Sequence, residues 1–334
     1  MITFLTAAQT AAALPYPTLV DALRTIYKEQ VQAPPRHVHQ LLAKTTPNGP
    51  TTLLLMPAWQ PNANLGVKLV TVAAGNGVRN LPSVHSIYLL FDTATGVPLA
   101  MLDGEELTQR RTAAASALAA AYLARPDAAT LLIIGTGRLA PFLAAAHCTI
   151  RPLRRVLVWG RSTQRAQALV DRLRHRGLGK GVTVDIAHDL ASAVGCSDII
   201  SCATTSTTPI VQGAWVSPGT HVDLVGGFRP DMREADDALM TTASLFVDTF
   251  AGALTEAGDL VQPMTAGLLD RAAIRAELAD LCSGQHPGRS GRAEITVFKS
   301  VGSAIQDLCA ANVVWAAHLA GAAVAPVVTP EISV

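Results

Sequence analysis

One lysine of the chain lies on the apolar side of a short strand-like run. In residues 66–72, Gly-Val-Lys-Leu-Val-Thr-Val, side chains alternate between two faces, so Lys68 shares a face with Val70 and Val72. Burial lowers the pKa of an ammonium group, which suits a lysine to proton transfer or to pairing with an anionic substrate group. A lysine at a sheet edge, with its ammonium group in water, fits the same spacing. Lys68 is therefore a candidate catalytic residue.

Two arginines are candidates for binding a carboxylate. Arg111 and Thr112 open a long alanine-rich run, where a helix starting there would offer free N–H groups, a hydroxyl and a guanidinium together. Arg36 follows two prolines, which predicts a rigid loop. An ordinary surface position fits either arginine as well, so both remain predictions for a carboxylate site.

The remaining reactive side chains have no partners at a useful spacing. His37 and His39 alternate on one face, but no third ligand follows at a metal-binding distance, so exposed or hydrogen-bonded histidines are expected. No Gly-x-Ser-x-Gly sequence and no pairing of Cys with His suggest covalent catalysis. The chemistry is therefore expected to come mainly from a bound cofactor.

A glycine-rich turn follows the buried-strand pattern at 130–134. The turn consists of Gly135, Thr136, Gly137, Arg138, Leu139 and Ala140. The first glycine permits a tight turn, the second lets the backbone approach a pyrophosphate, and the alanine allows close packing of helix on strand. A strand-to-helix turn without a ligand has the same pattern, but a second strand at 155–159 follows at the expected distance. The turn is thus predicted to bind a dinucleotide.

The residues after this second strand discriminate between the two nicotinamide dinucleotides. NAD sites place Asp or Glu there to hold the ribose 2′-hydroxyl, but no acid occurs between residues 153 and 167. Arg161, Ser162 and Arg165 can instead hold a 2′-phosphate, with Thr163 among them. A solvated helix start is the alternative for these arginines. NADPH is favoured, with NADH as a weaker cofactor.

These sites need two kinds of folded unit to position them. Residues 1–110 predict a helix at 16–29, a hairpin turn at 93–96 and strands. Those strands are expected at 52–56, 66–72 and 86–91. The segment has no phosphate-binding loop of its own, which indicates a separate α+β domain.

From residue 111 the pattern changes to an alanine-rich helix that ends at Arg125-Pro126-Asp127, followed by alternating strands and helices. Strands are expected at 130–134, 155–159, 182–186, 199–202, 221–225 and 245–247. The predicted fold class is α/β, with a Rossmann-type doubly wound parallel sheet plus a second α+β substrate and dimerisation domain.

The composition excludes several classes of protein. Only 15% of residues are charged and the net charge is +1, so no basic surface for nucleic acid is expected. The apolar run 112–124 is shorter than the roughly 20 residues of a membrane span, and the run 313–328 is expected to be a C-terminal interface helix. Five cysteines without a Cys-x-x-Cys pair favour reduced thiols, and a cytoplasmic protein without membrane partners is predicted.

The motifs together resemble the ornithine cyclodeaminase/μ-crystallin family. They are the runs at 66–70, 111–116, 135–137, 158–162, 225–234 and 297–302, in this order. The resemblance covers nearly the whole chain. It is strongest to the branch that reduces cyclic ketimine acids, the bacterial Δ1-pyrroline-2-carboxylate/Δ1-piperideine-2-carboxylate reductases.

The resemblance implies a homodimer with two domains in each subunit. Residues 1–112 with 303–334 would bind substrate and dimerise, and residues 113–302 would form the NADP-binding Rossmann domain. The positions implied for the substrate carboxylate and imine are Arg36, Lys68, Arg111 and Thr112. The positions implied near the nicotinamide half of the cofactor are Ser83, Arg111, Thr204, Val225, Lys299 and Ser300.

One departure from the family pattern discriminates between its branches. Ornithine cyclodeaminases place a catalytic Asp where this chain has Phe228, after Gly226 and Gly227. Because Phe228 cannot accept a proton or hold an amino group, deamination with cyclisation is disfavoured, and Phe228 is expected to line the substrate site. The NADP-type run after the second strand supports the same conclusion, since cyclodeaminases recycle a bound NAD.

The sequence therefore predicts an NADPH-dependent imine reductase. It would convert Δ1-pyrroline-2-carboxylate to L-proline and Δ1-piperideine-2-carboxylate to L-pipecolate, with Lys68 and Arg111 as catalytic residues. An NAD(P)-dependent, alanine-type amino-acid dehydrogenase is the first alternative. A μ-crystallin-like protein that binds NADP and a carboxylate ligand without turnover is the second.

Overall fold

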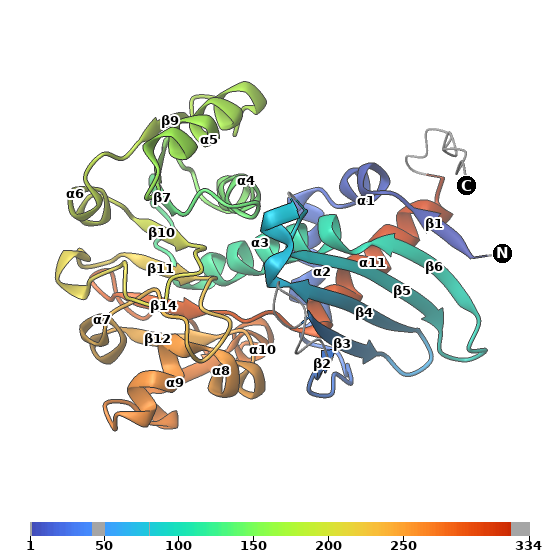
Figure 1. Ribbon diagram of the computed structural model, residues 1–334. Coiled ribbons are helices and arrows are strands. Elements are labelled where there is room, and N and C mark those ends of the chain that lie inside the picture. Colours follow the sequence, from blue (N-terminus) through green and yellow to red (C-terminus); the bar gives the residue numbers. More distant parts are fainter. Residues whose placement is uncertain (1, 42–50, 80, 322–334) are drawn as a thin grey trace.

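Two β-sheets connected by a long helix make up the molecule. The computed structural model describes residues 2–41, 51–79 and 81–321. A six-stranded sheet is built from residues that precede helix α3 (Gly104–Leu123), and an eight-stranded sheet from residues that follow it. Helix α3 runs between the two sheets (Figure 1).

The first sheet is antiparallel except at one edge. Its strands are β1 (Thr3–Leu5), β2 (His37–Leu41), β3 (Thr51–Trp59), β4 (Asn64–Ala73), β5 (Val84–Asp92) and β6 (Pro98–Asp103). They lie in the order β1-β6-β5-β4-β3-β2, with β1 and β6 in parallel. The strands predicted at 52–56, 66–72 and 86–91 are present and longer than predicted. The hairpin predicted at 93–96 joins β5 to β6, where the Asp92 N–H donates to Val97 O at 3.0 Å.

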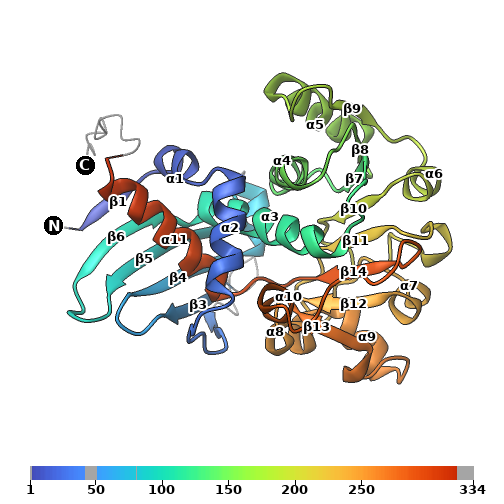
Figure 2. The ribbon, with the colours of Figure 1, turned by 180° about the vertical axis from the view of Figure 1, so that it is seen from behind.

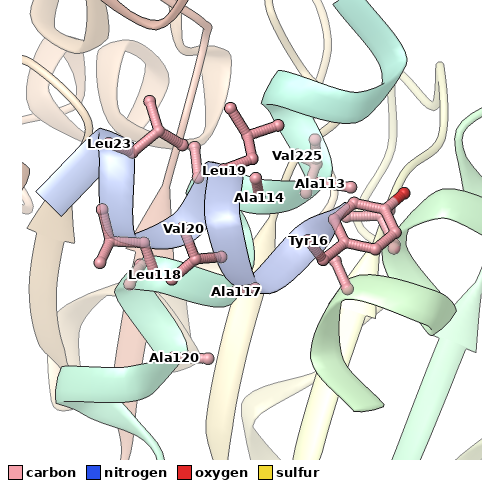
Figure 3. Packing of buried hydrophobic residues seen from close by; sticks show 14 of the residues in the cluster. Tyr16, Leu19, Val20, Leu23, Ala113, Ala114, Ala117, Leu118, Ala120 and Val225 are labelled. Carbon is pink, nitrogen blue, oxygen red and sulfur yellow. The ribbon is translucent and has the colours of Figure 1, made fainter. Parts of the chain in front are cut away.

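Helices pack on one face of this sheet. They are α1 (Ala7–Ala13), α2 (Tyr16–Ile26), α3 and α11 (Ala304–Leu319). Figure 2 shows α2 and α11 lying across the sheet. In Figure 3 the side chains of Leu19 and Leu23 of α2 lie beside the alanines of α3. Because alanine is small, the two helices approach closely and bury a continuous apolar core.

Two helix predictions need new boundaries. The helix predicted at 16–29 ends at Ile26. The C-terminal helix predicted at 313–328 is α11, which begins earlier, at Ala304, and ends at Leu319. The predicted residues 322–328 lie outside the described part of the chain.

The start of α3 differs from the prediction in a way that matters for the site. The helix begins at Gly104, and the Asp103 side chain caps it by accepting the Glu106 N–H at 2.8 Å. Arg111 therefore lies two turns inside the helix, where backbone N–H groups are already bonded. The prediction that Arg111 and Thr112 offer a helix N-terminus to a carboxylate is wrong, because the polar run before Arg111 is helical too.

The second sheet confirms the predicted fold class. Its eight strands lie in the order β13-β12-β14-β11-β10-β7-β8-β9, and every neighbouring pair is parallel. They are β7 (Thr130–Ile134), β8 (Arg155–Trp159), β9 (Thr183–Ile186), β10 (Ile199–Cys202), β11 (His221–Leu224), β12 (Ser244–Val247), β13 (Ile274–Glu277) and β14 (Thr296–Lys299). The strand order reverses between β7 and β10, as in Rossmann-type sheets.

Sequence patterns located six of these strands to within one residue and missed β13 and β14. The two missed strands, Ile-Arg-Ala-Glu and Thr-Val-Phe-Lys, contain charged side chains, so neither shows the apolar run of a buried parallel strand. Strand β14 also inserts between β11 and β12, which precede it in the chain.

Helices cover both faces of the parallel sheet. They are α4 (Ala140–Ile150), α5 (Thr163–Arg176), α6 (Leu190–Gly195), α7 (Asp237–Thr242), α8 (Phe250–Glu256), α9 (Gly258–Thr265) and α10 (Leu278–Ser283). A search of the described residues finds no helix with both the length and the apolarity to cross a membrane.

Buried hydrogen bonds tie α3 to the parallel sheet. Ser116 Oγ on α3 donates to Asp223 Oδ1 on β11 at 3.0 Å, and Ser201 Oγ on β10 donates to Asp223 Oδ2 at 2.7 Å. All three side chains are fully buried. Because α3 also carries Arg111, these bonds fix the position of Arg111 relative to the carboxyl ends of the parallel strands.

Candidate active site

A cavity of about 520 Å³ lies at the carboxyl ends of β7, β8 and β10, and the glycine turn forms part of its wall. Gly135 has φ +114°, and a Cβ there would lie 2.6 Å from Ala203 O, so only glycine fits. A Cβ at Gly137 would meet no atom within 4 Å, so this stretch of backbone faces open space. Both features suit a bound dinucleotide, whose pyrophosphate needs close approach to the backbone.

The end of this cavity near β8 has the charge of a phosphate site. Arg161, Ser162 and Arg165 line it, and none of the described residues that line it is a carboxylate. Ser162 also caps α5 by accepting the Arg165 N–H at 3.3 Å. The arrangement fits a ribose 2′-phosphate better than a 2′-hydroxyl that needs an acidic partner.

Three predicted cofactor residues are placed beside this cavity without lining it. Arg138 pairs with Glu105 of α3. Leu139 precedes α4 and packs on the apolar core, and Thr163 is the exposed first residue of α5. Thr136 and Thr204 do line the cavity, Thr204 in the segment that follows β10.

A second cavity, of about 310 Å³, lies between the first sheet and α3. Its cationic side chains include Arg36, Lys68 and Arg111, and Phe228 contributes an aromatic ring. Its apolar wall is formed by Leu54, Met56, Val70, Val72 and Val84. Arg138, which follows Gly137, also lines it, so the glycine turn reaches this second cavity. We call it the substrate cavity.

The two central cations of this cavity share one carboxylate. Lys68 Nζ lies 2.8 Å from Asp307 Oδ2, and Arg111 Nε lies 2.7 Å from Asp307 Oδ1. Arg111 Nη1 also donates to Gln306 Oε1 at 2.7 Å. Burial and the Arg111 charge lower the pKa of Lys68 to about 7, although Asp307 opposes the shift. Lys68 can therefore hold or release a proton near neutral pH.

Arg36 reaches the substrate cavity from the loop before β2. Its Nη2 donates to Gly302 O at 2.7 Å, and its Nε lies 3.0 Å from Glu256 Oε1. Burial raises the pKa of the Glu256 carboxyl, and Arg36 opposes that shift. The guanidinium is thus held from two sides at the cavity wall.

Five further predicted positions do not line the substrate cavity. They are Ser83, Thr112, Val225, Lys299 and Ser300. Thr112 is partly buried on α3, and Ser83 is exposed before β5. Val225, Lys299 and Ser300 are buried at the carboxyl ends of β11 and β14, close to where the nucleotide cavity ends.

Asp307, Gln306 and Glu256 were missed by sequence reasoning. Asp307 had a readable signal, because it is the only acidic residue between Glu294 and Glu331 in an apolar stretch. A buried helix carries such a charge at high cost unless it is paired, so it predicts a partner. Gln306 and Glu256 carry no comparable signal.

No group of three or more His, Cys, Asp or Glu side chains in the described ranges is arranged to hold a metal ion. His37 and His39 stack on each other with ring centroids 6.4 Å apart on the exposed strand β2. The expectation of exposed histidines is therefore confirmed for this pair.

The fold and the two cavities define a Rossmann-type protein with a cation-lined cavity beside the cleft at the carboxyl ends of its parallel strands. The chain belongs to the ornithine cyclodeaminase/mu-crystallin family, which it matches over residues 4–321. It is 42% identical over 264 residues to the Δ1-pyrroline-2-carboxylate reductase of Paracoccus denitrificans, covering 78% of this chain and 82% of that protein.

Two solved structures share the whole fold. The Δ1-pyrroline-2-carboxylate reductase of Thermococcus litoralis, in complex with NADH and L-proline, matches with a TM-score of 0.89 and 32% identity, over 96% of this chain and 98% of that one. An archaeal alanine dehydrogenase dimer with bound NAD matches with a TM-score of 0.87 and 27% identity, over 96% and 97%. The resemblance inferred from sequence motifs is confirmed.

Proposed function

We propose that the protein reduces cyclic ketimine acids with NADPH, converting Δ1-pyrroline-2-carboxylate to L-proline and Δ1-piperideine-2-carboxylate to L-pipecolate. The observation that carries the proposal is the convergence of Lys68 and Arg111 on Asp307 in the wall of a small cavity beside the glycine turn. The reductases of Paracoccus denitrificans and Thermococcus litoralis named above support the substrate class.

The charges at the substrate cavity favour an anionic substrate. Protonated Lys68 and Arg111 share the carboxylate of Asp307, and Arg138 pairs with Glu105 at the same cavity, so one positive charge is left to be balanced. A substrate carboxylate balances it, with Arg36 at the adjoining wall. Guanidinium groups bind carboxylates through paired, charge-assisted hydrogen bonds, which also fix the orientation of the substrate.

The residues around the cavity suit reduction of a C=N bond. When bound, the reduced nicotinamide supplies a hydride for the imine carbon, and the ring nitrogen needs a proton. Lys68, with its pKa near 7, holds a proton at the cavity wall, and Arg111 aligns the carboxylate. The apolar side chains and Phe228 give the hydrocarbon part of a substrate ring an apolar surface to lie against.

NADPH is the proposed cofactor because of the wall after β8. Arg161 and Arg165 line the nucleotide cavity there, and its described lining holds no carboxylate. The Thermococcus litoralis structure contains NADH, so NADH is proposed as the weaker cofactor of this chain.

We propose a homodimer formed through the first sheet. Helices pack on one face of that sheet, whereas Phe4 and Ile87 lie 50% and 40% exposed on its strands β1 and β5. Exposed apolar side chains gathered on one sheet mark an interaction surface, and two-fold symmetric dimers are the commonest use of one. Residues 1–112 with 303–334 form the proposed substrate and dimerisation domain, and residues 113–302 the proposed NADP-binding domain.

An alanine-type dehydrogenase is the second candidate, favoured by the match to the archaeal alanine dehydrogenase. Its substrates are an open-chain oxo acid and ammonia. A ligand-binding protein without turnover, similar to μ-crystallin, is the third candidate.

NADPH consumption with different substrates distinguishes the three. The reductase proposal predicts turnover with both preformed ketimine acids, L-configured products, and little turnover with pyruvate plus ammonia. Turnover with pyruvate plus ammonia alone would establish the dehydrogenase. Tight ligand binding without NADPH oxidation would establish the binding protein.

A further inference from the structure

Three buried charged residues outside the proposed chemistry lie next to one another. Glu234 follows β11, Asp259 lies in the first turn of α9, and Lys299 ends β14. None of the three is more than 1% exposed. Burying three charged groups together costs free energy unless each is paired and hydrogen-bonded, so their contacts indicate what they hold in place.

The first contact holds the wall of the nucleotide cavity. Glu234 Oε1 accepts hydrogen bonds from the Thr204 N–H at 2.6 Å and from Thr204 Oγ1 at 2.9 Å. Thr204 lines the cavity after β10, on the side away from Arg161. A dinucleotide that places its 2′-phosphate at Arg161 and crosses the carboxyl ends of the strands brings its nicotinamide to this side.

The second contact holds the segment that presents Phe228. Lys299 Nζ donates to Leu224 O at 3.1 Å and to Gly226 O, the two carbonyls that flank Val225 at the end of β11. Phe228, two residues after Gly226, lines the substrate cavity. Lys299 therefore fixes the backbone that leads into the substrate cavity.

Asp259 connects the two contacts. Its Oδ1 accepts the Glu234 N–H at 2.8 Å and the Ala235 N–H at 2.9 Å, and its Oδ2 lies 3.3 Å from Lys299 Nζ. A continuous buried path thus runs from Gly226 through Lys299, Asp259 and Glu234 to Thr204.

The two held segments also touch each other directly. A Cβ at Gly226 would lie 2.1 Å from Thr204 O and 2.4 Å from Glu234 Oε1. No side chain fits between the nucleotide wall and the Gly226 turn. The relative position of the two segments is therefore set at this point of contact.

We propose that Glu234 is a positioning residue for hydride transfer. Its carboxylate holds the cavity wall at Thr204, and its backbone N–H bonds to Asp259, which pairs with Lys299 and so connects this wall to the turn that carries Phe228. The inference rests on the proposed reductase activity. Glu234 touches neither cavity, so it acts through Thr204. The burial of Glu234 supports this role, because desolvation raises the pKa of its carboxyl to about 7, against the effect of Lys299. Burying such a carboxyl group costs free energy, which favours a role that depends on its position.

Two substitutions at Glu234 separate positioning from folding. Glu234→Gln keeps an Oε1 acceptor for both Thr204 donors, whereas Glu234→Ala removes it. Thr204→Val removes only the hydroxyl donor and tests the same contact should Glu234→Ala fail to fold. Asp231→Asn is the matched control, because Asp231 lies on the same segment, is exposed and pairs with Arg229 outside the path.

Three readouts are taken on each variant: kcat and the kinetic isotope effect at saturating NADPH and ketimine acid, and the Kd for NADPH from a titration without the ketimine acid. We expect Glu234→Ala and Thr204→Val to lower kcat about tenfold or more, because the nicotinamide and the substrate are no longer held in the right relative position. The Kd for NADPH should change less than about threefold. The kinetic isotope effect with 4-deuterated NADPH should rise, since hydride transfer becomes rate-limiting. Glu234→Gln should retain most of kcat. A Kd for NADPH that rises by the same factor by which kcat falls would overturn the proposal, as would an unchanged kcat in Glu234→Ala.

Failure of the reductase proposal is recognised separately. The fluorescence of bound NADPH reports the surroundings of its nicotinamide without any turnover. If the wild type oxidises no NADPH with either ketimine acid, the proposed function is wrong. The positioning role then stands only if Glu234→Ala changes this emission at unchanged Kd while Glu234→Gln and Asp231→Asn do not, and it falls if all four proteins give the same emission.

Discussion

The ammonium group of Lys68 lies 2.8 Å from the carboxylate of Asp307, a residue 239 positions later in the chain. The same carboxylate pairs with Arg111 at 2.7 Å. Strand β4, helix α3 and helix α11 thus each contribute one charged side chain to a single buried cluster. Because Asp307 binds both cations, it offsets part of their positive charge and raises the pKa of Lys68 against the effects of burial and Arg111.

The first prediction concerns Asp307→Asn. Asp307 raises the pKa of Lys68, whereas burial and Arg111 lower it to about 7, so the substitution should lower that pKa further. Lys68 carries its proton only below its pKa, so kcat/KM for the ketimine acid should fall as pH rises through about 7 in the wild type and at lower pH in the variant. A pH profile that coincides with that of the wild type would contradict this role.

Breaking a buried ion pair should also destabilise the fold by about 3–5 kcal/mol, measured by denaturant unfolding.

The second prediction concerns cofactor choice. Replacing Arg161 and Arg165 with Ala removes the charge-assisted bonds proposed for the 2′-phosphate, each worth about 1.5–3 kcal/mol. Because two such bonds are lost, we expect kcat/KM for NADPH to fall about 100-fold or more while the value for NADH changes little. Arg172→Ala is the control, since Arg172 is exposed on the same helix α5 but does not line the nucleotide cavity. Equal losses with both cofactors would remove the basis for NADPH preference.

The third prediction concerns Phe228. Phe228→Asp places a carboxylate in the wall that also holds Lys68 and Arg111, where it competes with the carboxylate of the substrate. The KM for the ketimine acid should rise about tenfold or more, while the Kd for NADPH stays within about twofold. Phe228→Leu keeps the apolar surface and should stay near the wild type. An unchanged KM for the ketimine acid in Phe228→Asp would show that Phe228 does not face the substrate.

The fourth prediction concerns the dimer. Ile87→Glu puts a charge into the exposed apolar face of the first sheet, where an interface would have to bury it. Size-exclusion chromatography with light scattering should show a dimer for the wild type and a monomer for this variant. Val97→Glu, in the exposed turn between β5 and β6, should leave the dimer intact. A wild-type monomer, or a dimer that tolerates Ile87→Glu, would place the interface elsewhere or exclude it.

Local patterns were sufficient for the parallel sheet and its glycine turn. Gly135 has a positive φ and lies close to Ala203 O, so a glycine is required there. The buried strands before and after this turn are apolar runs in the sequence. The motif and the strands could therefore be predicted together. The face of Lys68 was also predictable, because strand periodicity fixes which side chains lie together. The short strands β13 and β14 show no such run and were missed.

Long-range pairing was not predictable from local patterns. The partner of Lys68 lies on α11, and no periodicity links β4 to a helix more than 200 residues away. The error at Arg111 has a related cause. Residues 104–110 are mostly polar, with Leu107 as the one large apolar side chain, and the continuous apolar run of α3 begins only after them, so that run marked the buried part of α3 and not its start. Asp307 needed an argument from charge scarcity, not from spacing.

The central claim is tested most directly by comparing the wild type with Lys68→Met for reduction of Δ1-piperideine-2-carboxylate by NADPH. Methionine has nearly the length of lysine without its proton, and Arg111 remains to pair with Asp307. The wild type should form L-pipecolate, and kcat/KM should fall about 100-fold or more in Lys68→Met, as expected when a proton-donating group is lost, with an unchanged Kd for NADPH. A kcat/KM within about threefold of the wild type would contradict the assignment of Lys68 to the reaction.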